Sequence, residues 1–392
     1  MHPRHLPRGV IALGFVSLLM DTSSELIHSL LPTFMVAVLG ASAFEVGVIE
    51  GIAEATASIT KIFSGVISDW IGRRKPLVLL GYGMAALTKP LFPLATGLGA
   101  VLTARFVDRI GKGIRGAPRD ALIADITTAE QRGAAYGLRQ SMDTVGAFAG
   151  PLFALVLMTL SGDDFRLTMW FAVIPAFACV AFIVFGVDEP ERPAAAKRKF
   201  PLRRSEIAAL PHRYWWLVAF ASFLTLARFS EAFLLLRGQS LGVAPRHIPL
   251  ILIVMNLVYA ISAYPLGYLA DRLDRKVLLG FGIALLVAAD IVLAHAGSLP
   301  WLGLGVALWG LHMGATQGLL SALVADAAPP DLRGTAFGLF NLASGLGLLL
   351  ASVVAGALWT IGGPSLTFYC GAAFSIVALI GLASRERTAP GP

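Results

Sequence analysis

Several stretches of this sequence are apolar, free of charged residues and long enough to cross a lipid bilayer. The runs from Leu167 to Val187 and from Leu299 to Ala325 contain no Lys, Arg, Asp or Glu. A helix needs roughly 20 such residues to span the hydrocarbon core. Membrane-spanning strands would be about ten residues long and would alternate strictly between apolar and polar side chains, which these runs do not. The sequence therefore predicts an all-α membrane protein.

The hydropathy pattern extends over the whole chain. Hydrophobic residues make up 56% of it and charged residues only 14%, whereas a soluble domain has about 25% charged residues. This composition excludes an ordinary soluble protein. We expect twelve transmembrane helices in two six-helix bundles, with spans near 9–38, 43–70, 76–96, 98–119, 133–160, 166–187, 213–236, 248–270, 276–296, 299–325, 334–360 and 364–384.

A polar segment divides the chain. We expect an N-terminal six-helix bundle at 1–187, a cytoplasmic linker at 188–212 and a C-terminal bundle at 213–392. Basic residues gather in alternate loops, such as Gly72–Lys75 and Arg272–Lys276. Because Lys-rich and Arg-rich loops stay in the cytoplasm, both termini are expected there and the membrane is expected to be a bacterial-type inner membrane. The loop after the seventh span, with Arg237 and Arg246, is an exception.

The two halves share sequence. The letters ALIAD end at Asp125 and ALVAD ends at Asp326, while RGAAYGL begins at Arg132 and RGTAFGL begins at Arg333. Both pairs are 201 residues apart. Agreement of separate segments on one offset indicates a parallel duplication of a six-helix unit, an arrangement found in one large class of transporters.

Two motifs make the chain resemble the major facilitator superfamily over nearly its whole length. The first has the form G-x-x-x-D-x-x-G-R-R-K, from Gly65 to Lys75, and recurs in weaker form around Asp271. The second, Gly146 to Pro151, resembles the G-x-x-x-G-P motif of the drug:proton antiporter branch. The resemblance implies alternating access, and the second motif implies export coupled to protons.

These motif residues are the candidates for gating. A carboxylate at Asp69 or Asp271 suits the positive N-terminal end of a neighbouring helix, near Gly334 or Gly133 respectively. The glycines of the second motif would allow another helix to approach closely. The predicted gating set is Gly65, Asp69, Arg73, Arg74, Gly146, Gly150, Pro151, Asp271 and Arg272.

Ionisable side chains within the spans are expensive to bury and indicate function. Asp21, Glu25 and His28 are spaced by four and then three residues, so they share one face of the first span. We expect this stripe to line a central pathway and to carry the coupled proton. Arg105 or Arg109 of the fourth span would tune it, because a carboxylate that alternates between apolar surroundings and a nearby arginine takes up and releases a proton.

Other polar groups are expected to line the substrate cavity, and most of the charged ones fall in the first half. Asp290, near the outer end of the ninth span, is expected to reach water instead. Arg139 with Asp143 is interpreted as an ion pair. The cavity candidates are Glu50, Glu54, Lys89, Asp143, Arg228, Glu231, Asn256, Tyr259, His312, Gln317 and Asn341.

The sequence therefore predicts a secondary transporter, not an enzyme. Its substrate would be a small organic or drug-like compound, with an organic anion or a divalent metal as alternatives. A membrane-embedded sensor or enzyme is the alternative of another class, but the letters G-x-S-x-G at Gly238 lie in a loop between spans and not on a strand-to-helix turn. We expect no cofactor, no resident metal and no nucleic-acid partner, an ion gradient as energy source, contacts with membrane lipids and a monomer.

Overall fold

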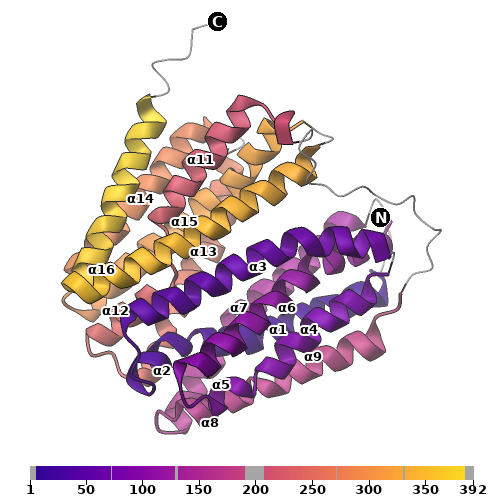
Figure 1. The fold of residues 1–392 in the computed structure, drawn as a ribbon, viewed down its shortest axis with the longest axis horizontal. Helices are drawn as coiled ribbons and strands as arrows, with labels where there is room; N and C mark the ends of the chain where they lie inside the picture. The colour runs from indigo at the N-terminus through magenta and orange to yellow at the C-terminus, as the bar shows by residue number, and fades with distance from the viewer. Residues whose placement is uncertain are drawn as a thin grey trace, which may run out of the picture. The chain divides into compact units, whose positions relative to one another are not determined.

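The computed structural model describes residues 6–71, 73–128, 131–189, 207–270, 272–329 and 332–384, which are helical with short connections and contain no strand (Figure 1). The helices before the linker are α1 (Arg8–His28), α2 (Leu31–Ala37), α3 (Ala43–Ile71), α4 (Lys75–Thr88), α5 (Leu91–Leu94), α6 (Leu98–Asp125), α7 (Arg132–Leu160), α8 (Phe165–Phe171) and α9 (Val173–Gly186). Those after it are α11 (His212–Leu226), α12 (Ala232–Ser240), the 3₁₀ turn η1 (Pro245–His247), α13 (Pro249–Ala270), α14 (Arg275–His295), α15 (Leu299–Ala327) and α16 (Arg333–Ser384).

These helices make up the twelve predicted spans within the described part of the chain. Four spans are broken in two: α1 with α2, α4 with α5, α8 with α9, and α11 with α12. The last two spans are joined in α16, which turns at Gly363, where φ is 77°. Seven of the helical segments are long and apolar enough to cross a membrane by length and composition alone. The predicted fold class, an all-α membrane protein of twelve transmembrane helices in two similar bundles, is confirmed.

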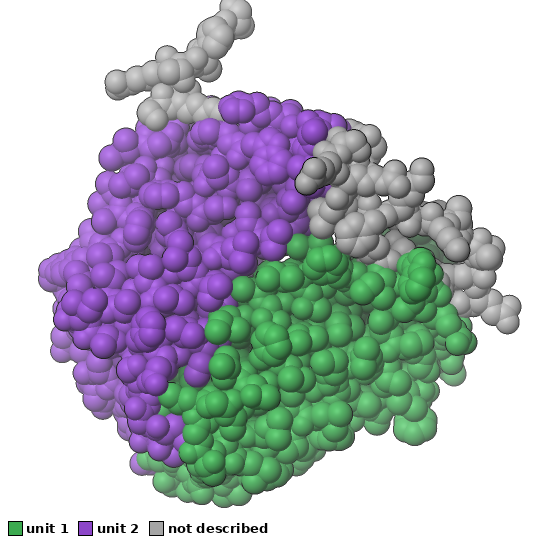
Figure 2. All heavy atoms as spheres, in the orientation of Figure 1, with its two compact units in different colours: residues 1–35, 52–201 green, residues 36–51, 202–392 purple. Residues whose placement is uncertain are grey.

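The chain forms two compact units, Met1–Met35 with Ile52–Pro201, and Val36–Gly51 with Leu202–Pro392 (Figure 2). The first turns of α3 belong to the second unit because they pack closely on α16. A Cβ atom on Gly356 would lie 2.7 Å from the carbonyl oxygen of Ala43. The part of the predicted linker from 190 to 206 lies outside the described residues, so its role as a linker stays a prediction.

The duplication is visible in how helices pack inside each unit. In the first, Gly113 of α6 lies against Thr60 of α3, and in the second Gly314 of α15 lies against Ser262 of α13. Gly81 of α4 meets α6, just as Gly282 of α14 meets α15. Both glycine pairs are 201 residues apart. The offset read from the sequence therefore relates equivalent positions of the two bundles.

The second motif forms the contact between α1 and α7. A Cβ atom on Gly146 would lie 3.0 Å from the Cβ of Asp21, and one on Gly150 would lie 2.7 Å from the Cβ of Glu25. The expected close approach of a neighbouring helix is therefore observed, and that helix is α1. The helix α7 continues through the buried Pro151 without interruption.

The exceptional arginine of the loop charge pattern has a structural explanation. Arg237 is 7% exposed, and its guanidinium donates hydrogen bonds to the carbonyl oxygens of Leu293, Ala294 and Ala296, at 2.9, 3.4 and 2.7 Å. These carbonyls lie at the C-terminal end of α14, where the last carbonyl groups have no partner within the helix. Arg237 therefore caps a helix and is not a free loop charge.

We predict that Gly150→Ala destabilises the protein, because the added methyl group would lie 2.7 Å from the backbone nitrogen of Leu26 and α1 would have to shift. Overpacking of this kind costs about 1–3 kcal/mol. Gly137→Ala is the matched control on the same helix, since nothing lies within 4 Å of its added Cβ and alanine favours helix. Thermal unfolding of the purified protein in detergent should show a lower midpoint for Gly150→Ala alone. Equal midpoints for the two variants would contradict the packing described.

Candidate functional site

The polar stripe of α1 is the partly accessible face of a mostly buried helix. Asp21, Glu25 and His28 are each half-buried, whereas their neighbours Met20 and Ser23 are 0% exposed. The helix ends at His28, directly before the break between α1 and α2. The predicted alignment of these three side chains on one face is therefore observed, while their role in proton transfer stays a prediction.

Three residues of α6 that are close in sequence contact side chains of α1, α4 and α3. Arg105 lies 3.4 Å from Nδ1 of His28 in α1. Asp108 accepts a hydrogen bond of 2.9 Å from Nζ of Lys89, the residue that ends α4. Arg109 lies 3.4 Å from Glu54 in α3. Positions spaced by three and four residues share a helix face, so α6 presents one charged face to the interior of the bundle.

The same face continues to Lys112 and Arg115, which the sequence reading did not assign to the site. The positions 105, 108, 112 and 115 are spaced by three, four and three residues, a signal that was available in the sequence. Arg115 lies near the end of the fourth span, which was expected at 98–119, but α6 extends to Asp125 and Arg115 is 5% exposed, with its guanidinium 4.6 Å from the centroid of the Tyr82 ring. A cation over an aromatic face is stabilised by the ring electrons.

Asp21 lies in a mixed electrostatic environment. The cations that interact with it are Arg115 and Lys112, while Asp143 and Glu25 act against its negative charge. Of the two arginines expected to tune the stripe, Arg105 contacts His28, the last member of the stripe, and Arg109 lies beside Glu54 of α3. The groups that could change the protonation of Asp21 therefore come from a later part of α6 than expected.

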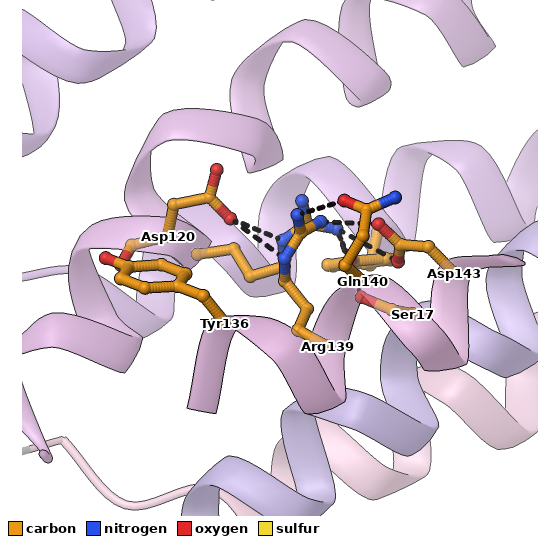
Figure 3. Close-up of polar contacts among 8 residues, drawn as sticks. Ser17, Asp120, Tyr136, Arg139, Gln140 and Asp143 are labelled. Carbon is orange, nitrogen blue, oxygen red and sulfur yellow. Dashed lines mark hydrogen bonds and ion pairs between the residues drawn. The ribbon is translucent and has the colours of Figure 1, made fainter. Parts of the chain in front are cut away.

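A second charged cluster joins α6 to α7 one to two turns further along (Figure 3). The predicted ion pair between Arg139 and Asp143 is present, at 2.5 Å. Arg139 also lies 3.7 Å from Asp120, and Arg119 donates to Ser17 and Tyr82 at 3.1 and 3.2 Å. Asp143 is thus a member of an ion-pair network, and this structural role competes with the cavity role expected for it.

The motif between α3 and α4 forms a third polar group. Arg74 is 8% exposed and its side chain donates to Asp125 and Ser68 at 3.0 and 2.8 Å, whereas Arg73 is exposed. Glu189 accepts hydrogen bonds from the backbone N–H groups of Arg74 and Lys75 at 2.7 and 2.6 Å, and so caps the start of α4. This cap was not predicted, because Glu189 lies in the segment that was assigned to the linker.

The second bundle has the equivalent ion pair, Arg275 with Asp326, but a local cap: Asp274 accepts from the backbone N–H of Lys276 at 2.8 Å. Arg272 lies over the ring of Tyr268, 4.3 Å from its centroid. The side chain of Asp69 and the whole of Asp271 lie outside the described residues, so their gating role stays a prediction, as does that of Gly65.

The cavity candidates of the second bundle lie in three kinds of environment. Arg228 and Glu231 lie at the break between α11 and α12, which replaces the continuous seventh span that was expected. Broken helices are typical of binding sites in transporters. His312 is 0% exposed and its Nδ1 lies 2.7 Å from the carbonyl oxygen of Gly282, a position that suits packing better than solute contact. The half-buried candidates are Asn256, Tyr259, Gln317 and Asn341.

Asp290 and Glu50 are both buried carboxyl groups. Asp290 was expected to reach water, but it is 0% exposed, so that expectation is wrong. Glu50 is buried, at 1% exposure, and belongs to the second unit. Within the described ranges, no three His, Cys, Asp or Glu side chains come together in a way that could hold a metal ion.

We predict strong coupling between Lys89 and Asp108, whose side chains are 2% and 4% exposed. Removal of one partner from a buried ion pair leaves an uncompensated charge and costs about 3–5 kcal/mol. Lys89→Met and Asp108→Asn should each lower the free energy of unfolding, measured by chemical denaturation in detergent, and the double variant should lose much less than the sum of the two. Additive losses would show that the two charges do not depend on each other.

Known proteins match this chain over most of its length. The model of the Major Facilitator Superfamily matches residues 13–236 and 215–392. An uncharacterized MFS-type transporter of Methanocaldococcus jannaschii is 33% identical over 382 residues, which cover 96% of this chain and 94% of the relative. The nucleoside transporter NupG has the same fold, with a TM-score of 0.79, 14% identity and coverage of 97% and 99%. The human organic anion transporter MFSD10 follows with a TM-score of 0.66, 18% identity and coverage of 96% and 99%. This chain belongs to the major facilitator superfamily and is a membrane transporter, not an enzyme.

Proposed function

We propose that this protein is a secondary transporter that exports a small organic compound in exchange for protons. The observation that carries the proposal is the half-buried stripe of Asp21, Glu25 and His28, whose neighbours Met20, Thr22, Ser23, Leu26 and Ile27 on α1 are buried. Ionisable groups inside a membrane protein face the bundle interior or a water-filled path and commonly relay protons. Asp21 and Glu25 are the proposed proton-binding groups.

The packing of α1 on α7 links these carboxylates to a conformational change. Gly146 and Gly150 lie directly against Asp21 and Glu25, so a tilt of α7 carries the carboxylates with it or slides past them. When the carboxylates move with α7, their distance from Lys112 and Arg115 on α6 changes. A carboxylate near these cations favours its charged form, and one that has moved away from them into apolar surroundings favours its protonated form. Alternation between the two surroundings loads and unloads a proton.

The substrate class is proposed from the chemistry of the interior. The first bundle combines the carboxylates of α1 with the cations of α6, a mixture that suits an organic compound with polar groups. The second candidate is an organic anion, because Lys112 and Arg109 add positive charge to the same face, and MFSD10 is described as an organic anion transporter. Nothing in the described side chains favours a divalent metal over these two.

We further propose that the protein works as a monomer in a bacterial-type inner membrane, with both termini in the cytoplasm. The orientation is supported by the basic loops between α3 and α4 and between α13 and α14. Arg237 also supports it. The loop after the seventh span carries Arg237 and Arg246 and would otherwise count against this orientation, but Arg237 binds the carbonyl oxygens at the end of α14 and is not a free loop charge.

We predict that Asp21→Asn and Glu25→Gln abolish transport of the substrate against its gradient. One-for-one exchange of substrate across the membrane should remain. The neutral side chains keep the size of the carboxyl group but cannot bind and release a proton. Proteoliposomes with an enclosed pH-sensitive dye and a panel of amphiphilic dyes, nucleosides and organic anions would measure proton flux driven by each solute. The solute that moves protons identifies the substrate class.

Asp188→Asn is the matched control, because Asp188 is exposed after the end of α9 and should leave proton flux unchanged. Undiminished uphill transport by both Asp21→Asn and Glu25→Gln, with correct folding, would contradict the assignment. Solute movement without any proton flux in the unmodified protein would contradict the coupling itself.

A further inference from the structure

The second bundle contains a carboxyl group that is completely buried. Asp290 lies in the last turns of α14, near its end at His295, and is 0% exposed. Neither of its carboxyl oxygens has a hydrogen-bond partner among the described residues. A buried polar group of this kind is rare in a folded protein, since each such group costs free energy.

The surroundings of this carboxyl group are apolar. Its Oδ2 lies against Gly371 of α16, 2.7 Å from the position of an added Cβ, and the ring of Phe229 contacts the same point at 3.2 Å. Phe229 packs on the rings of Trp309 and Phe368, with centroids 5.4 and 5.5 Å apart. Asp290 therefore faces a glycine backbone and an aromatic cluster.

Most charged side chains on α14 and on the segments around it have partners other than Asp290. Arg237 of α12 binds the carbonyl oxygens at the end of α14, and Arg228 interacts with Glu231 and Tyr259. His312 of α15 contacts the carbonyl oxygen of Gly282. Tyr369 of α16 is paired with His295, Arg275 is paired with Asp326 at the other end of α14, and Arg333 of α16 donates to the carbonyl oxygen of Ala325. Lys276 lies in the first turn of α14, and the half-buried thiol of Cys370 lies beside Gly371 on α16. Ser375 of α16 is buried and also lacks a partner among the described residues.

Comparison with the first bundle shows what is unusual. The residues 201 positions earlier than Asp290 and Trp309 are Lys89 and Asp108, which form the buried ion pair between α4 and α6. At the equivalent place in the second bundle, the cation has become a carboxyl group and the carboxylate has become an indole ring. The second bundle therefore has an acidic side chain where the first has a basic one, and no described side chain is hydrogen-bonded to it.

We propose that Asp290 is a proton-binding site of the second bundle and carries its proton in this conformation. An ionised carboxylate without a partner in apolar surroundings costs several kcal/mol, and a proton removes that cost. A metal cation would need several oxygen ligands, and no group of metal-binding side chains is found among the described residues. The site is separate from Asp21 and Glu25, but its use in transport rests on the proposed function.

Infrared difference spectroscopy of the full-length protein in lipid tests this directly. The unmodified protein at neutral pH should show the C=O stretching band of a protonated carboxylic acid, shifted in heavy water, and Asp290→Asn should remove it. The exposed Asp188→Asn should keep it. Asp290→Asn should also unfold at an unchanged or higher temperature, because the amide matches the neutral acid in size.

Absence of a band that depends on Asp290, with both proteins folded, would overturn the proposal. Loss of the band on addition of sodium at constant pH would overturn it in favour of a metal cation. The measurement needs no substrate, so its failure leaves the roles of Asp21 and Glu25 intact. In turn, undiminished uphill transport by the Asp21 and Glu25 variants leaves the infrared result unaffected.

Discussion

The first bundle depends on pairing charge that an apolar interior cannot solvate, and α6 is where most of this pairing occurs. Asp108 of α6 pairs with Lys89. On the same helix, Arg105 contacts His28 and Arg109 pairs with Glu54. An isolated charge at this depth would cost several kcal/mol, so the pairs of Asp108 with Lys89 and of Arg109 with Glu54 neutralise charge, and all three contacts fix the distance between two helices. The interior can therefore carry several ionisable side chains and remain folded, which a pathway for protons and polar solutes requires.

The duplication kept the packing and changed the chemistry. The glycines at 81 and 282, and at 113 and 314, make equivalent helix contacts in the two bundles. On α15, however, the positions equivalent to Arg105, Lys112 and Arg115 are Val306, Met313 and Thr316. Contact geometry between helices depends on small residues and backbone, so it survived the divergence. The charged face of α6 did not survive in the second bundle, which leaves one bundle rich in paired charge and the other dominated by aromatic packing.

Periodicity in the sequence was enough to predict the fold and the α1 stripe, because spans and faces follow from residue spacing alone. It failed where a residue's role depends on a distant partner. Arg115 follows Lys112 by three residues, as the other residues of this face follow one another, but its partner, the ring of Tyr82, lies 33 positions earlier and cannot be seen in local sequence. The cap from Glu189 and the capping role of Arg237 were hidden for the same reason. The burial of Asp290 depends on Gly371, which lies on another helix.

The contact between α1 and α7 explains why the glycine motif and the carboxylates occur together in one bundle. A side chain at Gly150 would meet the Cβ of Glu25 and the backbone of Leu26 and Thr22, so Glu25 can lie this close to α7 only because residue 150 has no side chain. A seam without interlocking side chains resists sliding less than one with knobs and holes, because no side chain must leave a packed pocket as the helices move. The α6 face is held by its ion pairs while the α1 face can shift past α7. A small movement at this seam would therefore change the surroundings of Asp21 and Glu25, and it would be limited by the contact of His28 with Arg105, which ties the end of α1 to α6.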